Sequence, residues 1–235
     1  MTLYYQDEHV TLYHGDSAGV LASLSDRSVD AVITDPPYTE RTHKMAKTNK
    51  GKGHGTKSID FKAFTDDDLM NALGECGRVS RRWVVATLAY QHAFKLEEQP
   101  PAGLRMMRIG AWVKTNPMPQ ISADRPGTGW ESIAYLHRDD VKPSWNGGGR
   151  AGNYVLPVVQ NEGHPTVKPL SMVQDFVRRF TDPGDVVLDP YAGSGTTLRA
   201  AVDEGRRAIG VELEERYCEI IAKRLAQGAF DFAAL

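Results

Sequence analysis

The chain has 235 residues, 41% of them hydrophobic, which is enough for one substantial α/β core and does not require a second domain. Its formal net charge of -2 argues against a uniformly basic nucleic-acid-binding protein, although it is compatible with a local basic patch. No stretch approaches the roughly 18 apolar residues of a membrane span, and the first residues lack a secretory signal pattern. We therefore expect a cytoplasmic protein with no membrane partner.

Strands and helices alternate in the pattern of apolar residues. The first unit is βαβ, with a strand at 10–13, a helical segment at 20–24 and an apolar strand at 29–34. Further strands are expected at 83–88, 108–114, 132–137, 185–188 and 207–211. Further helices are expected at 66–79, 170–180, 197–204 and 214–226. This alternation predicts a doubly wound, mostly parallel α/β sheet that binds ligands at the carboxyl ends of its strands.

Two segments interrupt the alternation, and we otherwise treat 1–235 as a single domain. The segment 39–60 predicts a mobile basic loop, since it combines glycines with many cations and few apolar residues. Segment 138–163 is rich in glycine and shows little periodicity. A loop of that length is uncommon in a compact domain unless it is functional or disordered.

The two cysteines, Cys76 and Cys218, have neither a CxxC partner nor a nearby cluster of histidines. A disulfide framework or a structural metal site is therefore not expected. Both thiols are predicted to be reduced and buried.

The strand at 29–34 leads directly into Asp35-Pro36-Pro37-Tyr38. This motif places a carboxylate, a proline-stiffened carbonyl and an aromatic ring at the end of a buried strand, which suits the binding of a planar amino group. The plainer alternative is a rigid turn after a strand, since Pro-Pro is common in turns.

A glycine-rich turn at 189–197 follows the strand at 185–188. Its glycines let the backbone turn tightly and approach a ligand closely. Glu212 follows roughly 20 residues later at the end of the next strand, where a carboxylate can accept hydrogen bonds from ribose hydroxyls. No phosphate-binding glycine motif is present, so the turn predicts a nucleoside cofactor without phosphates. A simple strand-to-helix turn capped by Thr196 or Thr197 is the alternative.

These motifs, with His164-Pro165-Thr166-Val167-Lys168-Pro169 between them, resemble the β class of DNA amino-methyltransferases. Members of that class transfer a methyl group from S-adenosylmethionine to adenine N6 or cytosine N4. The segments 15–16, 112–117 and 210–212 extend the resemblance over nearly the whole chain. It implies a circularly permuted methyltransferase (Rossmann-like) fold with a small loop-rich target-recognition region, because the Asp35 strand precedes the glycine turn in this sequence. The chain ends should then lie close together on the surface.

The resemblance implies S-adenosylmethionine as the cofactor. Asp16 is one candidate for the cofactor's adenine amino group, with a helix N-cap as its alternative role. Tyr191 stands where many members have phenylalanine. The full set assigned to the cofactor is Asp16, Asp35, His164, Thr166, Lys168, Asp189, Tyr191, Gly193, Gly195, Thr196, Thr197 and Glu212.

The catalytic residues implied by the resemblance are Asp35, Pro36, Pro37 and Tyr38. The exocyclic amino group of a base is a poor nucleophile because its lone pair is delocalised into the ring. The Asp35 carboxylate and the Pro36 carbonyl can each accept one N–H and turn the lone pair toward the methyl group. Tyr38 would stack on a base that has been flipped out of the duplex.

Double-stranded DNA is the expected partner. Cations of the segment 39–60 would contact phosphates, and side chains of 138–163 would read a short target, although a solvated loop without a partner is the plainer alternative. The cations of the first segment are Arg41, Lys44, Lys47, Lys50, Lys52 and Lys57. The candidates in the second are Lys142, Trp145 and Arg150.

Adenine N6 is favoured as the target, because Asp in the first position of the motif tends to accompany it. The alternatives are a cytosine-N4 enzyme, an enzyme acting on RNA or another planar amide, and a non-catalytic DNA-binding module on the same fold. Any restriction nuclease would be a separate chain. The oligomeric state, with a homodimer as one candidate, and the target sequence stay open.

Overall fold

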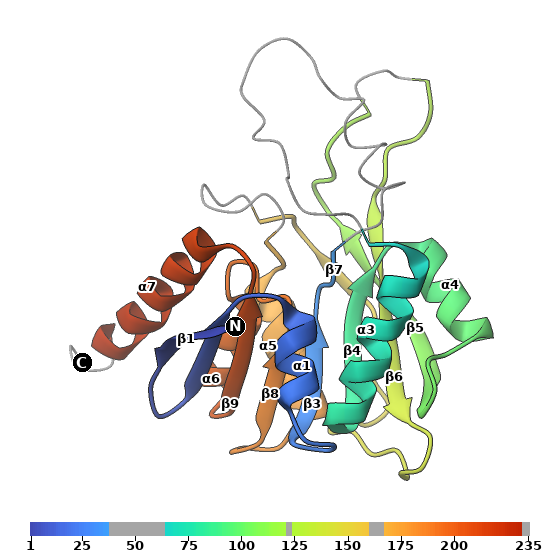
Figure 1. The fold of residues 1–235 in the computed structure, drawn as a ribbon. Helices are drawn as coiled ribbons and strands as arrows, with labels where there is room; N and C mark the ends of the chain where they lie inside the picture. The colour runs from blue at the N-terminus through green and yellow to red at the C-terminus, as the bar shows by residue number, and fades with distance from the viewer. Residues whose placement is uncertain (38–63, 121–123, 160–166, 232–235) are drawn as a thin grey trace.

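The computed structural model describes residues 1–37, 64–120, 124–159 and 167–231 (Figure 1). Within these ranges nine strands form one sheet, in the order β1-β2-β9-β8-β3-β4-β6-β5-β7. The strands are β1 Thr2–Gln6, β2 Val10–His14, β3 Val29–Thr34, β4 Ser80–Leu88, β5 Leu104–Lys114, β6 Trp130–Arg138, β7 Tyr154–Leu156, β8 Val186–Asp189 and β9 Arg207–Glu212. The helices are α1 Ser17–Ser23, α3 Asp66–Val79, α4 Tyr90–Glu98, α5 Leu170–Phe180, α6 Thr196–Asp203 and α7 Glu215–Asp231.

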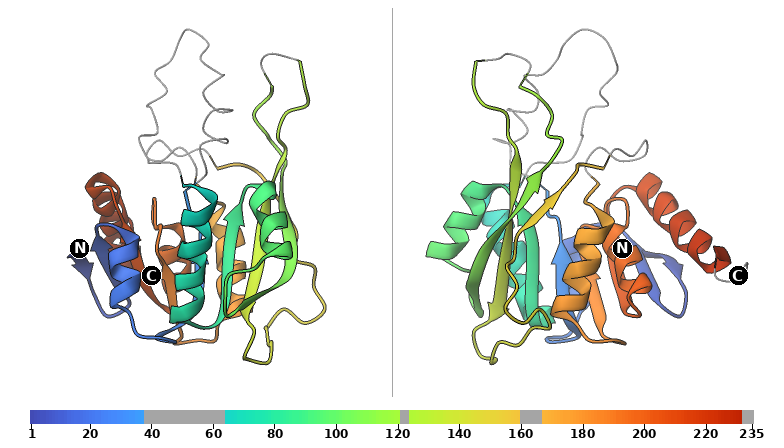
Figure 2. Two further views of the ribbon diagram at one scale, coloured as in Figure 1. Left: turned by 45° about the vertical axis from the view of Figure 1, so that its right-hand side comes forward. Right: turned by 180° about the vertical axis from the view of Figure 1, so that it is seen from behind.

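The sheet is parallel at its centre and contains antiparallel pairs toward both edges, although the last strand, β7, is parallel to β5. Strands β2, β9, β8, β3 and β4 are parallel, whereas β1 is antiparallel to β2, and β6 is antiparallel to both β4 and β5. Helices α1, α3 and α4 cover one face, and α5, α6 and α7 cover the other (Figure 2). The prediction of a doubly wound, mostly parallel sheet is confirmed.

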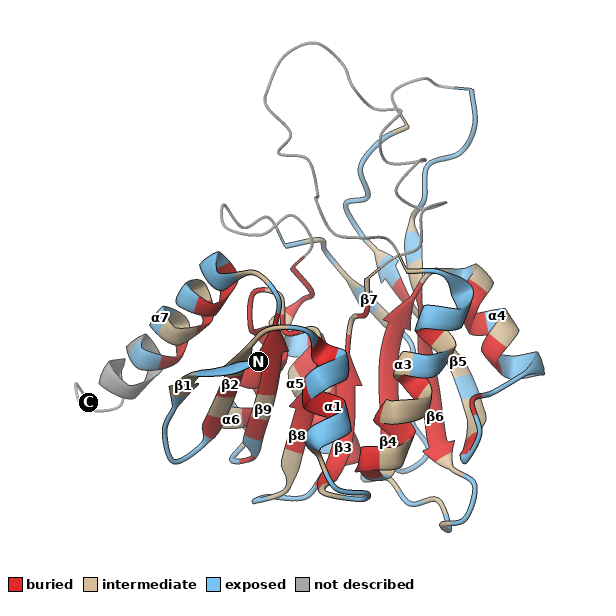
Figure 3. Ribbon diagram, in the orientation of Figure 1, coloured by how far each residue is buried: buried red, intermediate tan, exposed pale blue. Residues whose placement is uncertain are grey.

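Strand β3 lies near the middle of the sheet, and all its residues are buried (Figure 3). A strand covered on both faces is expected to read as a nearly continuous apolar run, and β3 departs from this only at Asp30 and Thr34. The Asp30 carboxylate is satisfied locally, since Oδ1 lies 2.8 Å from Arg81 Nη1 and Oδ2 accepts a 2.8 Å bond from the Val186 amide. The strand therefore delivers its last residues rigidly to the upper edge of the sheet.

The order of the strands shows the permutation. Strand β8, which leads into the glycine turn, pairs with β3, although β3 comes far earlier in the chain. At one end of the sheet, β1 pairs with β2, and α7 packs against β2 and β9 (Figure 1). The first strand and the last helix thus lie at the same edge, as a circularly permuted methyltransferase-like sheet predicts.

Both cysteines are buried and neither forms a disulfide. No group of His, Cys, Asp and Glu side chains in the described ranges has an arrangement that could hold a metal ion. None of the helices in these ranges is long and apolar enough to cross a membrane.

Candidate active site

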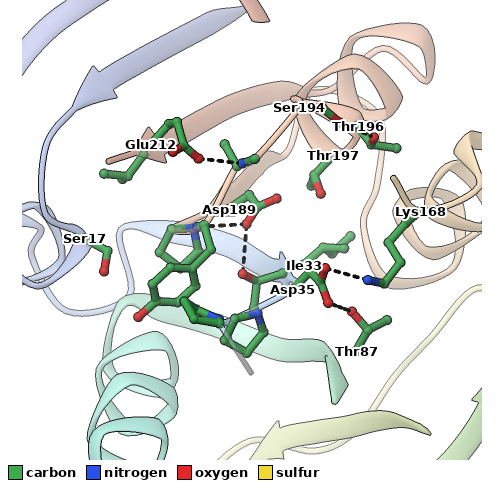
Figure 4. Close-up of a pocket in the computed structure, with 18 of the residues that line it drawn as sticks. Ser17, Ile33, Asp35, Thr87, Lys168, Asp189, Ser194, Thr196, Thr197 and Glu212 are labelled. Atoms are coloured by element: carbon green, nitrogen blue, oxygen red, sulfur yellow. Dashed lines mark hydrogen bonds and ion pairs between the residues drawn. The ribbon is translucent and has the colours of Figure 1, made fainter. Parts of the chain in front are cut away.

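A cavity of about 330 Å³ opens at the carboxyl ends of the parallel strands (Figure 4). Residues that follow or end β2, β3, β4, β8 and β9 line it, together with the first turns of α5 and α6. Its volume falls within the range of small-ligand sites, about 300–1,000 Å³. Ligands of doubly wound folds bind at this edge because the loops that leave parallel strands converge there.

The glycine turn forms one wall of the cavity. Gly193 and Gly195 have φ of 53° and 80°, in the left-handed region that favours glycine. A Cβ at Gly195 would stand 2.8 Å from Ile221 Cγ1 on α7, so the turn also needs glycine for space. The amides of Ala192 and Gly193 are tied to β9, because they donate to the Val211 carbonyl at 2.9 Å and to Glu212 Oε2 at 2.8 Å.

Glu212 is a buried carboxylate at the end of β9. Its two oxygens each accept a 2.8 Å bond, Oε2 from the Gly193 amide and Oε1 from the Glu214 amide. Burial raises its pKa to about 7, although these amides oppose the shift. An ionised carboxylate offers about four lone-pair sites, so two bonds leave acceptor capacity toward the cavity.

Asp189 connects the glycine turn to the Asp35 motif. Its Oδ1 accepts bonds from Thr34 Oγ1 at 2.8 Å and from the Tyr191 amide at 3.1 Å. Burial raises the pKa of Asp189 to about 6. Because Thr34 directly precedes Asp35, the two motifs are joined by one buried hydrogen bond between neighbouring strands.

Asp35 lies at the opposite side of the cavity with both carboxylate oxygens bonded. Thr87 Oγ1 donates to Oδ1 at 2.5 Å, and Lys168 Nζ donates to Oδ2 at 2.5 Å (Figure 4). Burial raises the pKa of Asp35, and the Lys168 ammonium opposes this rise. The two bonds hold the Asp35 carboxylate in a fixed orientation at the wall of the cavity.

Comparisons with known proteins agree with this geometry. The family model described as DNA methylase, for N6 and N4 methyltransferases, matches residues 144–223. The type II methyltransferase M2.LlaDCHI of Lactococcus lactis subsp. cremoris is 28% identical over 96% of this chain and 93% of its own length. The type II methyltransferase M2.DpnII of Streptococcus pneumoniae is 27% identical over 94% of this chain and 91% of its own length. The chain is thus similar to N6/N4 DNA methyltransferases over nearly its whole length.

Solved structures extend the likeness to three dimensions. The complex of M1.HpyAVI with SAM is 25% identical and gives a TM-score of 0.68, with 92% of this chain and 99% of that one covered. The cytosine-N4-specific PvuII DNA methyltransferase gives a TM-score of 0.72 at 16% identity, with 94% and 88% covered, which shows a shared fold. The residues matched by the family model include Lys168, the glycine turn and Glu212, whereas Asp35 lies outside them.

Most of the residues assigned to the site from sequence do line the cavity. These are Asp16, Asp35, Pro36, Pro37, Lys168, Asp189, Tyr191, Gly193, Thr196, Thr197 and Glu212. Gly195 does not line it, and instead stands at the N-terminus of α6. Three further predictions, for Tyr38, His164 and Thr166, lie outside the described residues.

Asp16 both caps a helix and lines the cavity. Its Oδ1 accepts a 3.0 Å bond from the Ala18 amide and caps α1, as the N-cap alternative expects. The same residue lines the cavity. Its role toward a cofactor stays a prediction.

The structure places the candidates of segment 138–163 away from the cavity. Residues 154–156 form β7 on β5, and the Trp145 ring lies 5.8 Å from Phe180, at the far end of α5 from the cavity. The Arg179 guanidinium lies 5.9 Å from the same ring. Lys142 and Arg150 are exposed. Trp145 therefore packs on a helix and is partly exposed, and its contact with DNA stays a prediction. The six cations of segment 39–60 lie outside the described residues.

Sequence reasoning did not identify Thr87, Glu131 and Lys114. Glu131 and Lys114 form an ion pair at 2.7 Å, and Glu131 Oε2 lies 3.5 Å from Lys168 Nζ. They come from β6 and β5, whose register places Trp112 opposite Glu131. No motif marks Thr87 or Glu131, and Lys114 belongs to the segment 112–117 of the resemblance, which assigned it no role. Only the pairing of the strands brings these residues close to Lys168 and Asp35.

Proposed function

We propose that this DNA methylase transfers a methyl group from S-adenosylmethionine to adenine N6 of a base flipped out of double-stranded DNA, within a short recognition sequence. The observation that carries the proposal is the hydrogen bond from Thr34 to Asp189, which fixes the Asp35 motif beside the glycine turn in one cavity. The Asp35 motif and the glycine turn are thereby held at a constant separation within that cavity, as transfer between two bound molecules requires.

The cavity fits a cationic nucleoside without phosphates. Asp189 and Glu212 bring two buried carboxylates to it, which favours a positively charged ligand. Glu212 keeps acceptor capacity for ribose hydroxyls, while Ile33, Met172 and Phe176 supply apolar walls. S-adenosylmethionine supplies an activated methyl group when it is bound there.

Asp35 and Pro36 would hold the target amino group. Each offers an acceptor for one N–H, so the nitrogen lone pair is directed across the cavity toward the glycine turn. Asp35 is also placed to receive the proton that the methylated amine releases. Thr87 donates to Asp35 Oδ1 and so fixes the orientation of the carboxylate before the base arrives.

DNA would approach the edge of the sheet where the cavity opens. The hairpin that connects β5 and β6 projects beyond the sheet on this side (Figure 1), and it carries Lys114 at its base and Arg125 in its described part. The basic segment 39–60 begins directly after the Asp35 motif, and its contact with phosphates is proposed from its sequence. Such contacts position the duplex without specifying a sequence.

Adenine N6 and cytosine N4 present the same chemistry to Asp35, since both are amino groups on planar rings. The aspartate in the first position of the motif favours adenine, by resemblance. Cytosine N4 is the second candidate, because a cytosine-N4-specific enzyme shares the fold.

The test is the transfer of tritiated methyl groups from S-adenosylmethionine to unmethylated duplex DNA, followed by nucleoside analysis and single-molecule mapping. N6-methyladenine at a short repeated motif is the expected product. N4-methylcytosine would keep the mechanism and change the base. If the purified protein binds the cofactor but methylates neither DNA nor RNA, the non-catalytic reading replaces this proposal.

A further inference from the structure

The lysine that bonds Asp35 also faces a second carboxylate. Lys168 Nζ lies 2.5 Å from Asp35 Oδ2 and 3.5 Å from Glu131 Oε2. The other oxygen of Glu131 lies 2.7 Å from Lys114 Nζ. Two carboxylates and two ammonium groups therefore alternate in one chain of contacts, and the Lys168 side chain is only 8% exposed.

This arrangement conflicts with the entry of a target base. Under the proposed function, an N–H of the target amino group must reach the Asp35 carboxylate, yet Lys168 already occupies Oδ2. A bond between an ammonium and a carboxylate is stronger than one from a neutral amine. If the buried Lys168 ammonium moved away from Asp35 and found no other acceptor, it would also carry a large desolvation cost.

Glu131 offers that other acceptor. The Lys168 ammonium lies only 3.5 Å from Glu131 Oε2, so a short movement would bring the two into a hydrogen bond. Glu131 Oε1 is held by Lys114. Movement of Lys168 from Asp35 toward Glu131 would leave the net charge of the four groups unchanged. The two carboxylates are already coupled, since burial raises the pKa of Asp35, Lys168 lowers it and Glu131 raises it.

We propose that Glu131 is a positioning residue for methyl transfer, which accepts Lys168 when the target amino group takes its place on Asp35 Oδ2. This inference rests on the proposed function. Glu131 acts through Lys168 and touches neither the base nor the methyl group. Lys114 holds Glu131 so that its second oxygen keeps facing Lys168.

The test compares Glu131→Gln and Glu131→Asp with the wild type in single-turnover methyl transfer at saturating DNA and cofactor. Glu219→Gln is the matched control, because it breaks an exposed Glu–Lys pair on α7, in which Lys223 Nζ lies 2.7 Å from the carboxylate. Cofactor affinity and the thermal midpoint are measured on every variant. Glu131→Gln should slow transfer by about tenfold or more, with cofactor affinity within about threefold. Glu131→Asp keeps the charge and should recover much of the lost rate, and Glu219→Gln should stay within about twofold of the wild type.

A wild-type rate in Glu131→Gln would overturn the inference. So would a loss of rate that follows the thermal midpoint and that Glu131→Asp does not recover, because a purely structural role behaves in that way. If Glu131→Gln does not fold, Lys114→Met, which removes the partner that holds Glu131 Oε1, takes its place: slowed transfer with unchanged cofactor affinity supports the inference, and a wild-type rate overturns it. A wild type that methylates no nucleic acid removes the proposed function and this inference together, whereas an active wild type beside a fully active Glu131→Gln removes the inference alone.

Discussion

Asp35 Oδ2 accepts a 2.5 Å hydrogen bond from Lys168 Nζ, although the two residues are 133 positions apart in the chain. The contact closes one side of the cavity, because Asp35 follows β3 and Lys168 precedes α5. It also sets the electrostatics of the proposed transfer site, since Lys168 is the strongest influence that opposes the effect of burial on Asp35.

Replacement of Lys168 by methionine should move the acid limb of the pH–rate profile to higher pH. Lys168 lowers the pKa of Asp35, so its loss lets burial and Glu131 raise that pKa further. In this variant the charged and titratable groups around Asp35 are Glu131, Lys114 and Asp189. None of them replaces the Lys168 ammonium, because Lys114 is paired with Glu131. The measurement is the single-turnover rate against pH. Lys95→Met, which removes an exposed partner of Asp66, serves as the control, and an acid limb that stays in place for Lys168→Met would contradict the account.

Glu212→Gln should change how stability without cofactor depends on pH. The pKa of Glu212 is raised from 4.5 to about 7 by burial, so between these values the native state holds a proton that the unfolded state has lost. The free energy of unfolding therefore falls as pH rises through this window, and Asp189, with a pKa of about 6, acts in the same direction. In Glu212→Gln the fall between pH 5 and 8 should be smaller by about 1–3 kcal/mol, as measured by urea unfolding.

The same experiment has an internal control in Glu219. The hydrogen bond from Lys223 lowers the pKa of Glu219, so Glu219→Gln cannot remove a fall in stability toward high pH. Equal slopes in Glu212→Gln and the wild type would contradict the assignment of a raised pKa to Glu212.

Gly195→Ala should destabilise the protein by about 2–4 kcal/mol, because it adds backbone strain at φ 80° and places a Cβ 2.8 Å from Ile221 Cγ1. Gly205→Ala is the matched control. Gly205 has φ 73° and open space around the added atom, so only the strain of about 1 kcal/mol should appear. Urea unfolding measures both. Equal losses would show that contact between the glycine turn and α7 does not constrain this position.

Trp145→Ala separates packing from DNA contact. The ring packs on Phe180 beneath Arg179, so its loss should reduce the free energy of unfolding by about 1–3 kcal/mol. DNA affinity, measured by fluorescence anisotropy at fixed salt, should stay unchanged in the folded variant. A large loss of affinity at unchanged stability would support the DNA contact that the sequence predicts for this residue.

Local signals made some elements predictable. The helix at 66–79 was predicted with the bounds that α3 shows, since Leu69, Leu73 and Cys76 are spaced on one face and Thr65 forms a capping box with Asp68. The helix at 170–180 likewise matches α5. In both, apolar spacing and the adjacent residues determine where the helix lies, without information from distant strands.

Other elements depend on their neighbours and were not predicted. Strand β1 is an exposed edge with few buried side chains, and β7 spans only Tyr154–Leu156 and exists through its pairing with β5. Helix α4 begins at Tyr90, and the preceding residue, Ala89, provides no side-chain cap. Segment 138–163 therefore read as an irregular loop, although its described part packs on β5 and α5.

The candidate site divides in the same way. Asp35 and the glycine turn could be predicted because each motif directly follows an apolar strand, and such strand ends meet at one edge of a parallel sheet. The sequence could not predict the places of Thr87, Glu131 and Lys114 in the site. They are ordinary strand residues, and only the register of their strands brings them close to Asp35 and Lys168. Residues that are close to a motif in space but far from it in the chain can be identified only from the structure.

Methyl transfer by the wild type and by Asp35→Ala, each with its cofactor affinity measured in parallel, tests the central claim most directly. The account predicts that the wild type labels an amino group of a DNA base, and that Asp35→Ala loses at least about 100-fold in rate while it still binds S-adenosylmethionine. An Asp35→Ala protein that binds the cofactor and methylates DNA at the wild-type rate would contradict it.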